Sequence, residues 1–423
     1  MKTDLCVVGM GYIGLPTSAI FAKNGLNVVG VDINEKAVNL INEGKIHIEE
    51  PGLPDLVKKV VENGKLRASL KPVPADAYII AVPTPIHEDY SADINYVISA
   101  CKNIAPLVKK GDVIIVESTI PPRTMNDIVQ PIFEEFGFNV EEDLYIAHCP
   151  ERVLPGRILI ELIENTRIVG GLNALAAKKA AEFYKQVVNG EVIETDALTA
   201  EMAKLMENTF RDVNIALANE LVKISDKLGV NAYDVIQFAN KHPRVNIHMP
   251  GPGVGGHCLA VDPYFIVEKT PEESQLIQTA RNINNSMPGF VVEKIKGLVK
   301  NTDNPKIAVL GITYKGNVDD IRESPAIEVL HHLLANKSFN IAVHDPHVLQ
   351  ENTSIQLHSL EDALKDADLA VVLTDHGEFK NLLTQDELAN MRSKIFFDTK
   401  KVLIPVEDAE VKLYNFNNVF EIN

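Results

Sequence analysis

Residues 4–16 read DLCVVGMGYIGLP, a short apolar run followed by glycines at positions 9, 11 and 14. A strand, a glycine-rich turn and a helix with this spacing are typical of a dinucleotide site. Gly9 permits the tight turn, Gly11 lets the backbone approach a pyrophosphate, and Gly14 allows the helix to pack closely against the strand. The phosphates would lie at the helix N-terminus, where unpaired N–H groups and the helix dipole favour anions. A purely structural glycine turn is the alternative.

An acidic residue supports the dinucleotide interpretation. Asp32 follows the apolar run Val28–Val31, at the distance expected for a carboxylate that accepts hydrogen bonds from a ribose diol. That carboxylate would repel a 2′-phosphate, and the next two residues, Ile33 and Asn34, carry no positive charge. The sequence therefore predicts that NAD is preferred over NADP.

The rest of the first third alternates apolar runs with amphipathic segments. The apolar runs are Leu5–Val8, Val28–Val31, Tyr78–Val82, Val113–Val116 and Leu144–Ala147, and the amphipathic segments include Glu35–Asn42 and Pro54–Asn63. Strands separated by helices indicate βαβ units and a parallel, doubly wound sheet.

The middle of the chain has a helical period. From Thr199 to Gly229 apolar residues recur at steps of three and four, which predicts one long amphipathic helix that ends at Gly229. The chain to about Pro288 is expected to be mostly helical, apart from the glycine- and proline-rich loop Met249–Gly256. The polar stretch Asn301–Pro305 is typical of a linker.

After this linker the strand signals of the opening return in the same order. The matched segments are Lys306–Gly311 with Asp4–Gly9, Asn340–Asp345 with Asn27–Asp32, Ala367–Thr374 with Ala75–Val82, and Lys394–Asp398 with Asp112–Val116. We therefore predict an α/β fold with two doubly wound, Rossmann-like domains joined by a long central helix and a helical dimerisation domain. The expected domains are 1–195 for NAD, 196–300 for the helical part with the cysteine loop, and 301–423 for a nucleotide-sugar.

Composition excludes several classes of protein. The 423 residues carry 58 acidic and 41 basic side chains, a net charge of −17, which argues against a nucleic-acid or membrane-surface partner. No run of about 18 apolar residues suggests a membrane span, and the N-terminus does not have the pattern of a signal peptide. The four cysteines contain no CxxC pair, so neither a disulfide framework nor a metal site is expected. We expect a cytoplasmic enzyme.

The stretch Met249–Asp262, MPGPGVGGHCLAVD, surrounds Cys258 with glycines and prolines. Such a loop can bring the thiol against a ligand with few side chains in the way. The other three cysteines are expected in strand or helix cores, so we predict Cys258 as a nucleophile, with simple packing as the alternative. His257 alone is a weak catalytic candidate.

Two further groups of polar residues lie where catalytic residues are expected. Lys204, Asn208 and Arg211 share one face of the long helix, where lysine and asparagine can stabilise developing negative charge. An exposed polar stripe is the alternative. Glu151, in Pro150–Arg152, follows a predicted strand and could activate water, or could be a simple helix-start acid.

The second glycine turn, GITYKG at residues 311–316, lacks the three-glycine pattern. A mononucleotide or nucleotide-sugar is therefore expected there rather than a second dinucleotide. The charged segment Asn317–Pro325 follows it at the carboxyl end of a strand, where doubly wound sheets bind ligands. Its alternative is a solvated surface turn.

NAD, a nucleophilic cysteine and a water-activating glutamate together fit one reaction. An alcohol is oxidised to an aldehyde, the cysteine captures it, and a second hydride loss gives a thioester that water cleaves to an acid. A β-hydroxyacid dehydrogenase would not explain the second nucleotide-type domain or Cys258. A non-catalytic nucleotide-sugar sensor would not require Cys258, Lys204, Asn208 and Glu151 together.

Several motifs resemble the UDP-glucose/GDP-mannose dehydrogenase family, in the right order along nearly the whole chain. They are GMGYIGLP from Gly9, PTP from Pro83, EST from Glu117, PER from Pro150, KLMENTFRDVNIALANE from Lys204, GVGGHCLAVDP around Cys258 and GITYKGNVDDIRESP from Gly311. The cysteine loop and the helix motif are most similar to the branch that oxidises UDP-N-acetyl-D-mannosamine.

The resemblance implies roles for individual residues. Cys258 would form the thiohemiacetal and the thioester. Lys204 and Asn208 would stabilise oxyanions, and Asp262 with a water would assist proton transfer. Thr119 would lie near the reacting carbon and the nicotinamide. The implied cofactor contacts are Gly9, Gly11, Tyr12, Ile13, Gly14, Asp32, Pro83, Thr84, Thr119 and Arg322. The implied substrate contacts are Glu151, Arg152, Val153, Lys204, Asn208, Arg211, His242, Arg244, Gly255, His257, Tyr314 and Lys315.

The resemblance also implies a homodimer or a higher oligomer, in which Arg244 contacts the substrate of the neighbouring subunit. Two departures set the chain apart from the UDP-glucose branch. Pro155 replaces that branch's second glutamate, which leaves hydrolysis to Glu151, and His257 replaces the aromatic residue before the nucleophile. UDP-N-acetyl-D-mannosamine is therefore the expected substrate, with UDP-N-acetylglucosamine or UDP-glucose as alternatives.

Overall fold

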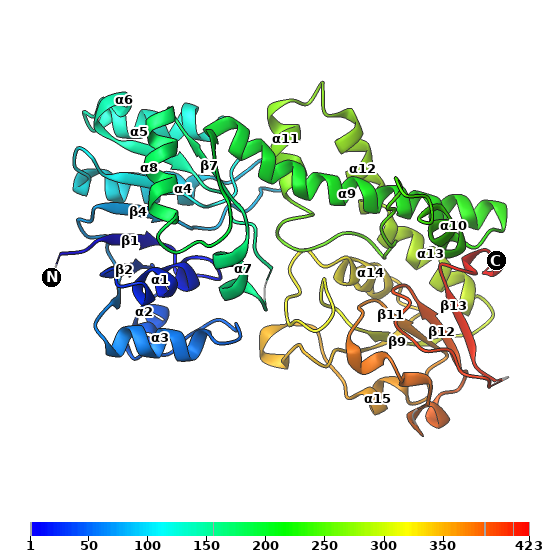
Figure 1. The fold of residues 1–423 in the computed structure, drawn as a ribbon. Coiled ribbons are helices and arrows are strands. Elements are labelled where there is room, and N and C mark those ends of the chain that lie inside the picture. Colours follow the sequence, from blue (N-terminus) through cyan, green and yellow to red (C-terminus); the bar gives the residue numbers. More distant parts are fainter. Residues whose placement is uncertain (1, 155, 385, 409, 423) are drawn as a thin grey trace. The chain divides into compact units, whose positions relative to one another are not determined.

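The computed structural model describes residues 2–154, 156–384, 386–408 and 410–422. The chain forms two compact units (Figure 1). The N-terminal unit is the chain up to Glu207 together with Tyr264–Pro271. The C-terminal unit is Asn208–Pro263 together with the chain from Glu272 onward. The expected division into three domains, at residues 195 and 300, stays a prediction.

An eight-stranded sheet, ordered β3-β2-β1-β4-β5-β6-β7-β8, is the centre of the N-terminal unit. Its strands are β1 (Leu5–Val8), β2 (Val28–Val31), β3 (Leu66–Ser69), β4 (Ala77–Ile80), β5 (Val113–Val116), β6 (Tyr145–His148), β7 (Arg167–Gly171) and β8 (Val192–Asp196). Every neighbouring pair is parallel except β6 with β7. The winding reverses between β1 and β4, and the carboxyl ends of these strands form the crevice where such sheets bind ligands.

Helices pack on both faces of this sheet. They are α1 (Gly14–Lys23), α2 (Glu35–Asn42), α3 (Leu53–Glu62), α4 (Asn95–Ile104), α5 (Gln130–Glu135), α6 (Val140–Asp143), α7 (Ile158–Glu164) and α8 (Ala174–Tyr184). Because strand side chains alternate between faces, Leu5 and Val7 of β1 join one core with residues of α1, α3 and α8. Cys6 joins a second core with residues of α4 and α5.

The C-terminal unit contains a second sheet, ordered β10-β9-β11-β12-β13 and parallel throughout. Its strands are β9 (Lys306–Leu310), β10 (Asn340–His344), β11 (Leu369–Val372), β12 (Ile395–Asp398) and β13 (Lys412–Asn415), and its helices are α10 (Ala232–Ala239), α12 (Gln275–Asn285), α13 (Met287–Val299), α14 (Pro325–Leu334) and α15 (Leu360–Leu364). Two further helices, α9 (Ala197–Leu228) and α11 (Asp262–Lys269), contribute to both units.

The predicted fold class is confirmed, and most predicted elements lie within two residues of their observed bounds. The long helix is α9, and Gly229 follows it with φ +69°, a left-handed conformation that ends helices at little cost for glycine. The strand signals missed β3, β7, β8 and β13. These strands carry charged or glycine residues instead of a continuous apolar run; β8, for example, reads VIETD and lies at the sheet edge.

Within the described part of the chain, no helix combines the length and the apolar composition that crossing a bilayer requires.

Candidate active site

The glycine turn after β1 has the geometry that its sequence predicts. A Cβ on Gly9, at φ +96°, would lie 2.3 Å from the Ala81 carbonyl oxygen, and one on Gly14 would lie 1.8 Å from the Gly9 carbonyl oxygen. A Cβ on Gly11 would meet no atom within 4 Å. Gly9 and Gly14 are therefore required for close packing, whereas Gly11 leaves open space where a pyrophosphate is expected, at the N-terminus of α1.

Asp32 lies directly after β2 and binds the same turn. Its Oδ2 accepts the Met10 N–H at 2.9 Å, and its Oδ1 accepts the Asn34 N–H at 2.8 Å. A carboxylate offers about four lone-pair sites, so each oxygen retains one for a ribose hydroxyl. This arrangement fits the adenosine ribose of NAD.

Two other predicted cofactor residues meet at the carboxyl ends of β4 and β5. The Thr84 hydroxyl donates a hydrogen bond to the Thr119 carbonyl oxygen at 2.7 Å, and both side chains are half-buried. Pro83 is exposed, Tyr12 is 43% exposed, and Ile13 is half-buried. The structure thus brings Thr84 and Thr119 together, and their roles with the cofactor stay predictions.

Glu151 lies in a buried group of charged side chains. Its Oε2 is 3.1 Å from Nη1 of Arg167, and its Oε1 accepts the Arg152 N–H at 2.6 Å. The same Arg167 nitrogen lies 3.7 Å from Oε1 of Glu117, which accepts a hydrogen bond from the Tyr184 hydroxyl at 2.5 Å. The guanidinium also stacks over the Tyr184 ring, 5.0 Å from its centroid.

The sequence interpretation assigned no role to Glu117, Arg167 or Tyr184. Burial raises the pKa of Glu117 to about 7, opposed by the Arg167 guanidinium and assisted by the Glu151 carboxylate. Glu117 and Arg167 could have been found in the sequence as charged residues next to apolar strand residues: Glu117 directly follows β5, and Arg167 begins β7. A buried charge at such a position requires a partner.

The Lys204 side chain is almost buried on α9, with 9% exposure. It lies close enough to His148 to contribute, after burial, to lowering the pKa of that imidazole to about 4. The ring is therefore neutral at physiological pH, although His148 Nδ1 donates to the Val116 carbonyl oxygen at 2.8 Å, a bond that opposes this shift. Arg152 forms an ion pair with Glu207 at 2.6 Å, and the neighbouring Val153 is half-buried.

In the C-terminal unit, Cys258, Asp262 and Asn208 are linked. The Asp262 N–H donates to the Cys258 carbonyl oxygen at 2.8 Å, and the Asn208 Nδ2 donates to Oδ2 of Asp262 at 2.6 Å. Asn208 and Asp262 are buried, whereas Cys258 is exposed.

The other three cysteines are buried, as expected. Burial raises the pKa of the thiols of Cys6, Cys101 and Cys149 to about 11, 12 and 12. Cys258 is thus the one cysteine of the four whose thiol can reach a substrate.

The glycines before Cys258 allow its loop to pack against the charged segment after the second glycine turn. A Cβ on Gly255 would lie 2.2 Å from the Glu323 carbonyl oxygen, and one on Gly256 would lie 2.7 Å from the Tyr314 ring. In the segment Asn317–Pro325, the Glu323 backbone and Pro325 pack against this loop, whereas the side chains of Asn317, Asp319, Arg322 and Glu323 are exposed. The segment forms one surface with the cysteine loop.

His257 belongs to that surface. Its Nε2 lies 3.4 Å from Oδ2 of Asp320, and Asp320 accepts two hydrogen bonds of 2.9 Å from the Arg322 guanidinium. Burial, with a contribution from Arg322, lowers the pKa of His257, so the ring is neutral near pH 7.

The remaining predicted substrate residues are exposed: Arg211, His242, Arg244 and Lys315. Among them, His242 Nδ1 accepts the Arg244 N–H at 3.3 Å. Pro155 lies outside the described residues.

The predicted catalytic residues fall into two groups by unit. Thr119, Glu151 and Lys204 belong to the N-terminal unit, and Asn208, Cys258 and Asp262 belong to the C-terminal unit.

Comparison with known families covers most of the chain. Three parts match the UDP-glucose/GDP-mannose dehydrogenase family: residues 3–188 match its NAD binding domain, residues 198–286 its central domain, and residues 308–405 its UDP binding domain.

Individual relatives match along nearly their full length. A UDP-N-acetyl-D-mannosamine dehydrogenase of Methanococcus vannielii is 49% identical over 408 residues, 94% of this chain and 93% of that protein. An NDP-N-acetyl-D-galactosaminuronic acid dehydrogenase of Ralstonia solanacearum is 46% identical over 94% of this chain and 95% of that protein. The solved structure of the UDP-N-acetyl-mannosamine dehydrogenase Cap5O from S. aureus is 52% identical, with a TM-score of 0.93 and full coverage of both chains.

Proposed function

The chain belongs to the UDP-glucose/GDP-mannose dehydrogenase family, and from that premise we propose that it oxidises the C6 alcohol of UDP-N-acetyl-D-mannosamine to the uronate with two NAD per sugar. The observation that carries this proposal is the arrangement around Cys258. The Cys258 thiol is exposed in a glycine-rich loop, and the backbone carbonyl oxygen of Cys258 accepts a hydrogen bond from the N–H of Asp262, whose carboxylate contacts Asn208. The named relatives support the choice of sugar.

The N-terminal unit would hold the cofactor. Gly11 leaves space for the pyrophosphate, the N-terminus of α1 supplies N–H donors, and Asp32 retains two lone pairs for a ribose diol. When bound, NAD supplies the hydride acceptor, and the conversion of a primary alcohol to an acid requires two such transfers.

Cys258 makes the four-electron reaction possible. After the first oxidation its sulfur adds to the aldehyde carbon and forms a thiohemiacetal, whose C–H bond is again that of an oxidisable alcohol. Loss of the second hydride leaves a thioester. The amide of Asn208 and the ammonium of Lys204 would stabilise the negative oxygen of these species, and Asp262 would take part in proton transfer.

Hydrolysis of the thioester is assigned to a water positioned by Glu151. Water attacks the acyl carbon, the C–S bond breaks, and the thiol of Cys258 is regenerated with the free carboxylate as product. The contact of Glu151 with Arg167 at 3.1 Å fixes the orientation of the carboxylate, as positioning of a reactive group requires.

The C-terminal unit would bind the UDP part of the substrate. Its match to the family's UDP binding domain supports this assignment, as do the exposed Lys315 ammonium and the surface shared by Tyr314 and the cysteine loop. We assign Arg211 and His242 to the N-acetylated sugar, and His257 and Arg322 to the rim of the site. The use of NAD and of a nucleotide-sugar is consistent with a cytoplasmic location.

The stoichiometry of the reaction tests this function. Purified protein should form two NADH per UDP-N-acetyl-D-mannosamine consumed, with little activity on UDP-N-acetylglucosamine, UDP-N-acetylgalactosamine or UDP-glucose. Formation of two NADH per molecule of one of the other sugars would support the mechanism but identify that sugar as the substrate. One NADH with release of an aldehyde would contradict the role of Cys258.

Replacement of the nucleophile gives a second test. Cys258→Ser should abolish turnover and leave NAD affinity unchanged, since the cofactor turn is in the other unit. Cys101→Ala is a matched control, because Cys101 lies on α4 with its side chain buried in the core. It should retain turnover, and equal activity of Cys258→Ser and the wild type would exclude covalent catalysis.

We also propose a homodimer formed along α9. Met206, Phe210, Leu217 and Ile224 are 45%, 59%, 53% and 47% exposed, and their spacing places them on one stripe of the helix. The stripe lies on the face opposite Lys204. A contiguous exposed apolar face of this kind marks a protein interface, and a second copy of the chain would cover it. The exposed Arg244 would then contact the partner's substrate.

A further inference from the structure

The two units repeat the same local construction. In the N-terminal sheet Val31 of β2 pairs with Val8 of β1, and Asp32 follows. In the C-terminal sheet His344 of β10 pairs with Leu310 of β9, and Asp345 follows. The strand register therefore makes Asp345 the counterpart of Asp32.

The same comparison identifies the counterpart of Thr84. Ile80 of β4 pairs with Val8, and Val372 of β11 pairs with Leu310. Four residues further along stand Thr84 in one unit and His376 in the other.

The two aspartates differ in the hydrogen bonds they accept. Oδ2 of Asp345 accepts the Ile312 N–H at 2.7 Å and contacts Nε2 of His376 at 3.1 Å, while Oδ1 accepts the N–H groups of His347 and Val348 at 2.9 and 3.2 Å. These contacts use all four lone-pair sites. Asp32 accepts two backbone hydrogen bonds and keeps two sites. Asp345 therefore has no capacity for a ribose diol.

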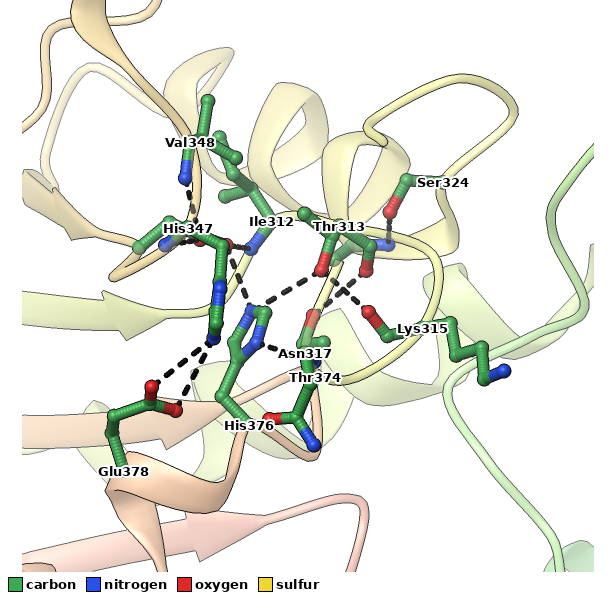
Figure 2. Close-up of polar contacts among 12 residues, drawn as sticks. Ile312, Thr313, Lys315, Asn317, Ser324, His347, Val348, Thr374, His376 and Glu378 are labelled. Atoms are coloured by element: carbon green, nitrogen blue, oxygen red, sulfur yellow. Dashed lines mark hydrogen bonds and ion pairs between the residues drawn. The ribbon is translucent and has the colours of Figure 1, made fainter. Parts of the chain in front are cut away.

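His376 is fully buried, and its neighbours determine its tautomer (Figure 2). Nδ1 lies 3.0 Å from the backbone nitrogen of Asn317, which can only donate, so Nδ1 accepts. The ring proton of neutral His376 is then on Nε2, where it is shared by Asp345 Oδ2 and by the hydroxyl oxygen of Thr313 at 3.2 Å. One ring thus connects the end of β10 to both ends of the segment Thr313–Asn317.

Further contacts hold that segment against the residues after β11. The Thr374 hydroxyl donates to the Thr313 carbonyl oxygen at 2.8 Å, and the Asn317 side-chain oxygen accepts the Gly377 N–H at 2.9 Å. A Cβ on Gly316 would lie 2.2 Å from the Asp375 carbonyl oxygen, so only glycine permits this approach. The Lys315 side chain points away from the His376 group in Figure 2.

The imidazoles of His347 and His376 and the Glu378 carboxylate place three possible metal ligand atoms within 4.8 Å of one another. Their geometry does not favour a metal ion. The two rings are stacked, with centroids 4.7 Å apart and planes at 27°, and imidazole lone pairs lie in the ring plane. Two stacked rings do not direct their lone pairs at one point, and both nitrogens of His376 already have partners.

We propose that His376 is a positioning residue for nucleotide binding by the C-terminal unit. Its ring bonds to the carboxylate of Asp345, the counterpart of the ribose-binding aspartate, so that this carboxylate cannot bind a ribose. The same ring fixes the segment Thr313–Asn317 in the conformation in which Tyr314 and Lys315 contact a uridine diphosphate. This inference rests on the proposed function, which assigns the UDP moiety to that segment. The C-terminal unit therefore binds its nucleotide through the turn after β9 and not through the carboxylate of Asp345.

Two substitutions separate the contacts of the ring. In His376→Asn the side-chain oxygen stands near the position of Nδ1, so the bond from the Asn317 N–H is kept. In His376→Gln the amide nitrogen stands near the position of Nε2, so the bond to Asp345 is kept and the bond to Asn317 is lost.

Calorimetric titration of the full-length protein with UDP alone measures the effect. The Gln variant should bind UDP about tenfold more weakly than the wild type, which is about 1.4 kcal/mol. The Asn variant should stay within threefold, and NAD should bind both as it binds the wild type. Hydrogen exchange should be faster in residues 311–317 of the Gln variant and unchanged around Gly9.

Equal UDP affinity in the wild type and the Gln variant would overturn the inference, as would a tenfold loss in the Asn variant. If the Gln variant does not fold, His376→Ala decides, because it removes the bonds to both Asn317 and Asp345 and should bind UDP at least tenfold more weakly, and an affinity equal to that of the wild type would overturn the inference. Failure of the wild type to bind UDP would instead contradict the proposed function, so the two failures are distinguishable.

Discussion

Replacement of Asp32 by asparagine tests the cofactor site most directly. The Asp32 carboxylate accepts the N–H groups of Met10 and Asn34 and retains one lone pair on each oxygen. Asparagine keeps one acceptor oxygen and places an NH₂ group where the second oxygen stood. One of the two ribose hydrogen bonds is lost, and the other no longer involves a charge.

The expected loss of NAD affinity follows from these bonds. A hydrogen bond to a charged group contributes about 1.5–3 kcal/mol, so losing one and weakening the other should cost roughly 2–4 kcal/mol in NAD binding. At about 1.4 kcal/mol per tenfold change, the dissociation constant of NAD should rise roughly 30- to 700-fold. The preference for NAD over NADP should also narrow, because the charge that repels a 2′-phosphate is removed.

Titration of NADH fluorescence, and calorimetry with NAD and NADP, would measure this change. The internal repeat supplies a matched control: Asp345→Asn alters the equivalent turn in the other unit and should leave NAD affinity unchanged. A dissociation constant for NAD within threefold of the wild type in Asp32→Asn would refute the assignment. So would an equal loss in both variants, since it would indicate a general effect on the fold.

Three further changes have defined outcomes. Burial raises the pKa of Glu117 from 4.5 to about 7, so its contribution to stability is present below pH 4.5 and is lost as the pH rises to 7. As the pH rises from 5 to 8, the free energy of unfolding of Glu117→Gln should therefore increase by roughly 2–3 kcal/mol relative to that of the wild type. Circular dichroism melts of both proteins across this pH range would contradict the assignment if this increase is absent. Arg281→Met leaves Asp212 buried without the guanidinium that lies 2.6 Å away, and urea unfolding should show a destabilisation of about 3–5 kcal/mol. The control Lys296→Met removes an exposed ion pair, and its free energy of unfolding should stay within about 0.5 kcal/mol of the wild type. Phe210→Glu places a charge on the exposed stripe of α9 and should give monomers in light scattering; an unchanged mass would show that this stripe is not the interface.

Much of the fold was predictable because its signals are local. The strand, glycine turn and helix from Leu5 to Lys23 follow from residue spacing alone, and so does the end of α9 at Gly229. The four predicted strands of the second sheet were found because they repeat the pattern of the first. Strands such as β7 and β8 were missed, since their partners, and not their own residues, decide that they are strands.

The same distinction applies to the candidate site. Cys258 could be singled out from its glycine-rich surroundings, and its exposure agrees with that choice. Charges at strand positions could mark Glu117 and Arg167 as candidates, but their grouping with Tyr184 could not be predicted, because these residues lie directly after β5, on β7 and on α8 and meet only through the order of the sheet. No sequence spacing relates a residue on one strand to a residue two strands away.

The two aspartates show this limit most clearly. By sequence, Asp32 and Asp345 are each an acid after a short strand, and the repeat of the strand pattern already marks them as counterparts. Which of them can bind a ribose depends on the hydrogen bonds that the fold brings to each carboxylate. At Asp345 a buried histidine, 31 residues further along the chain, takes the last lone pair, and only the tertiary structure places it there.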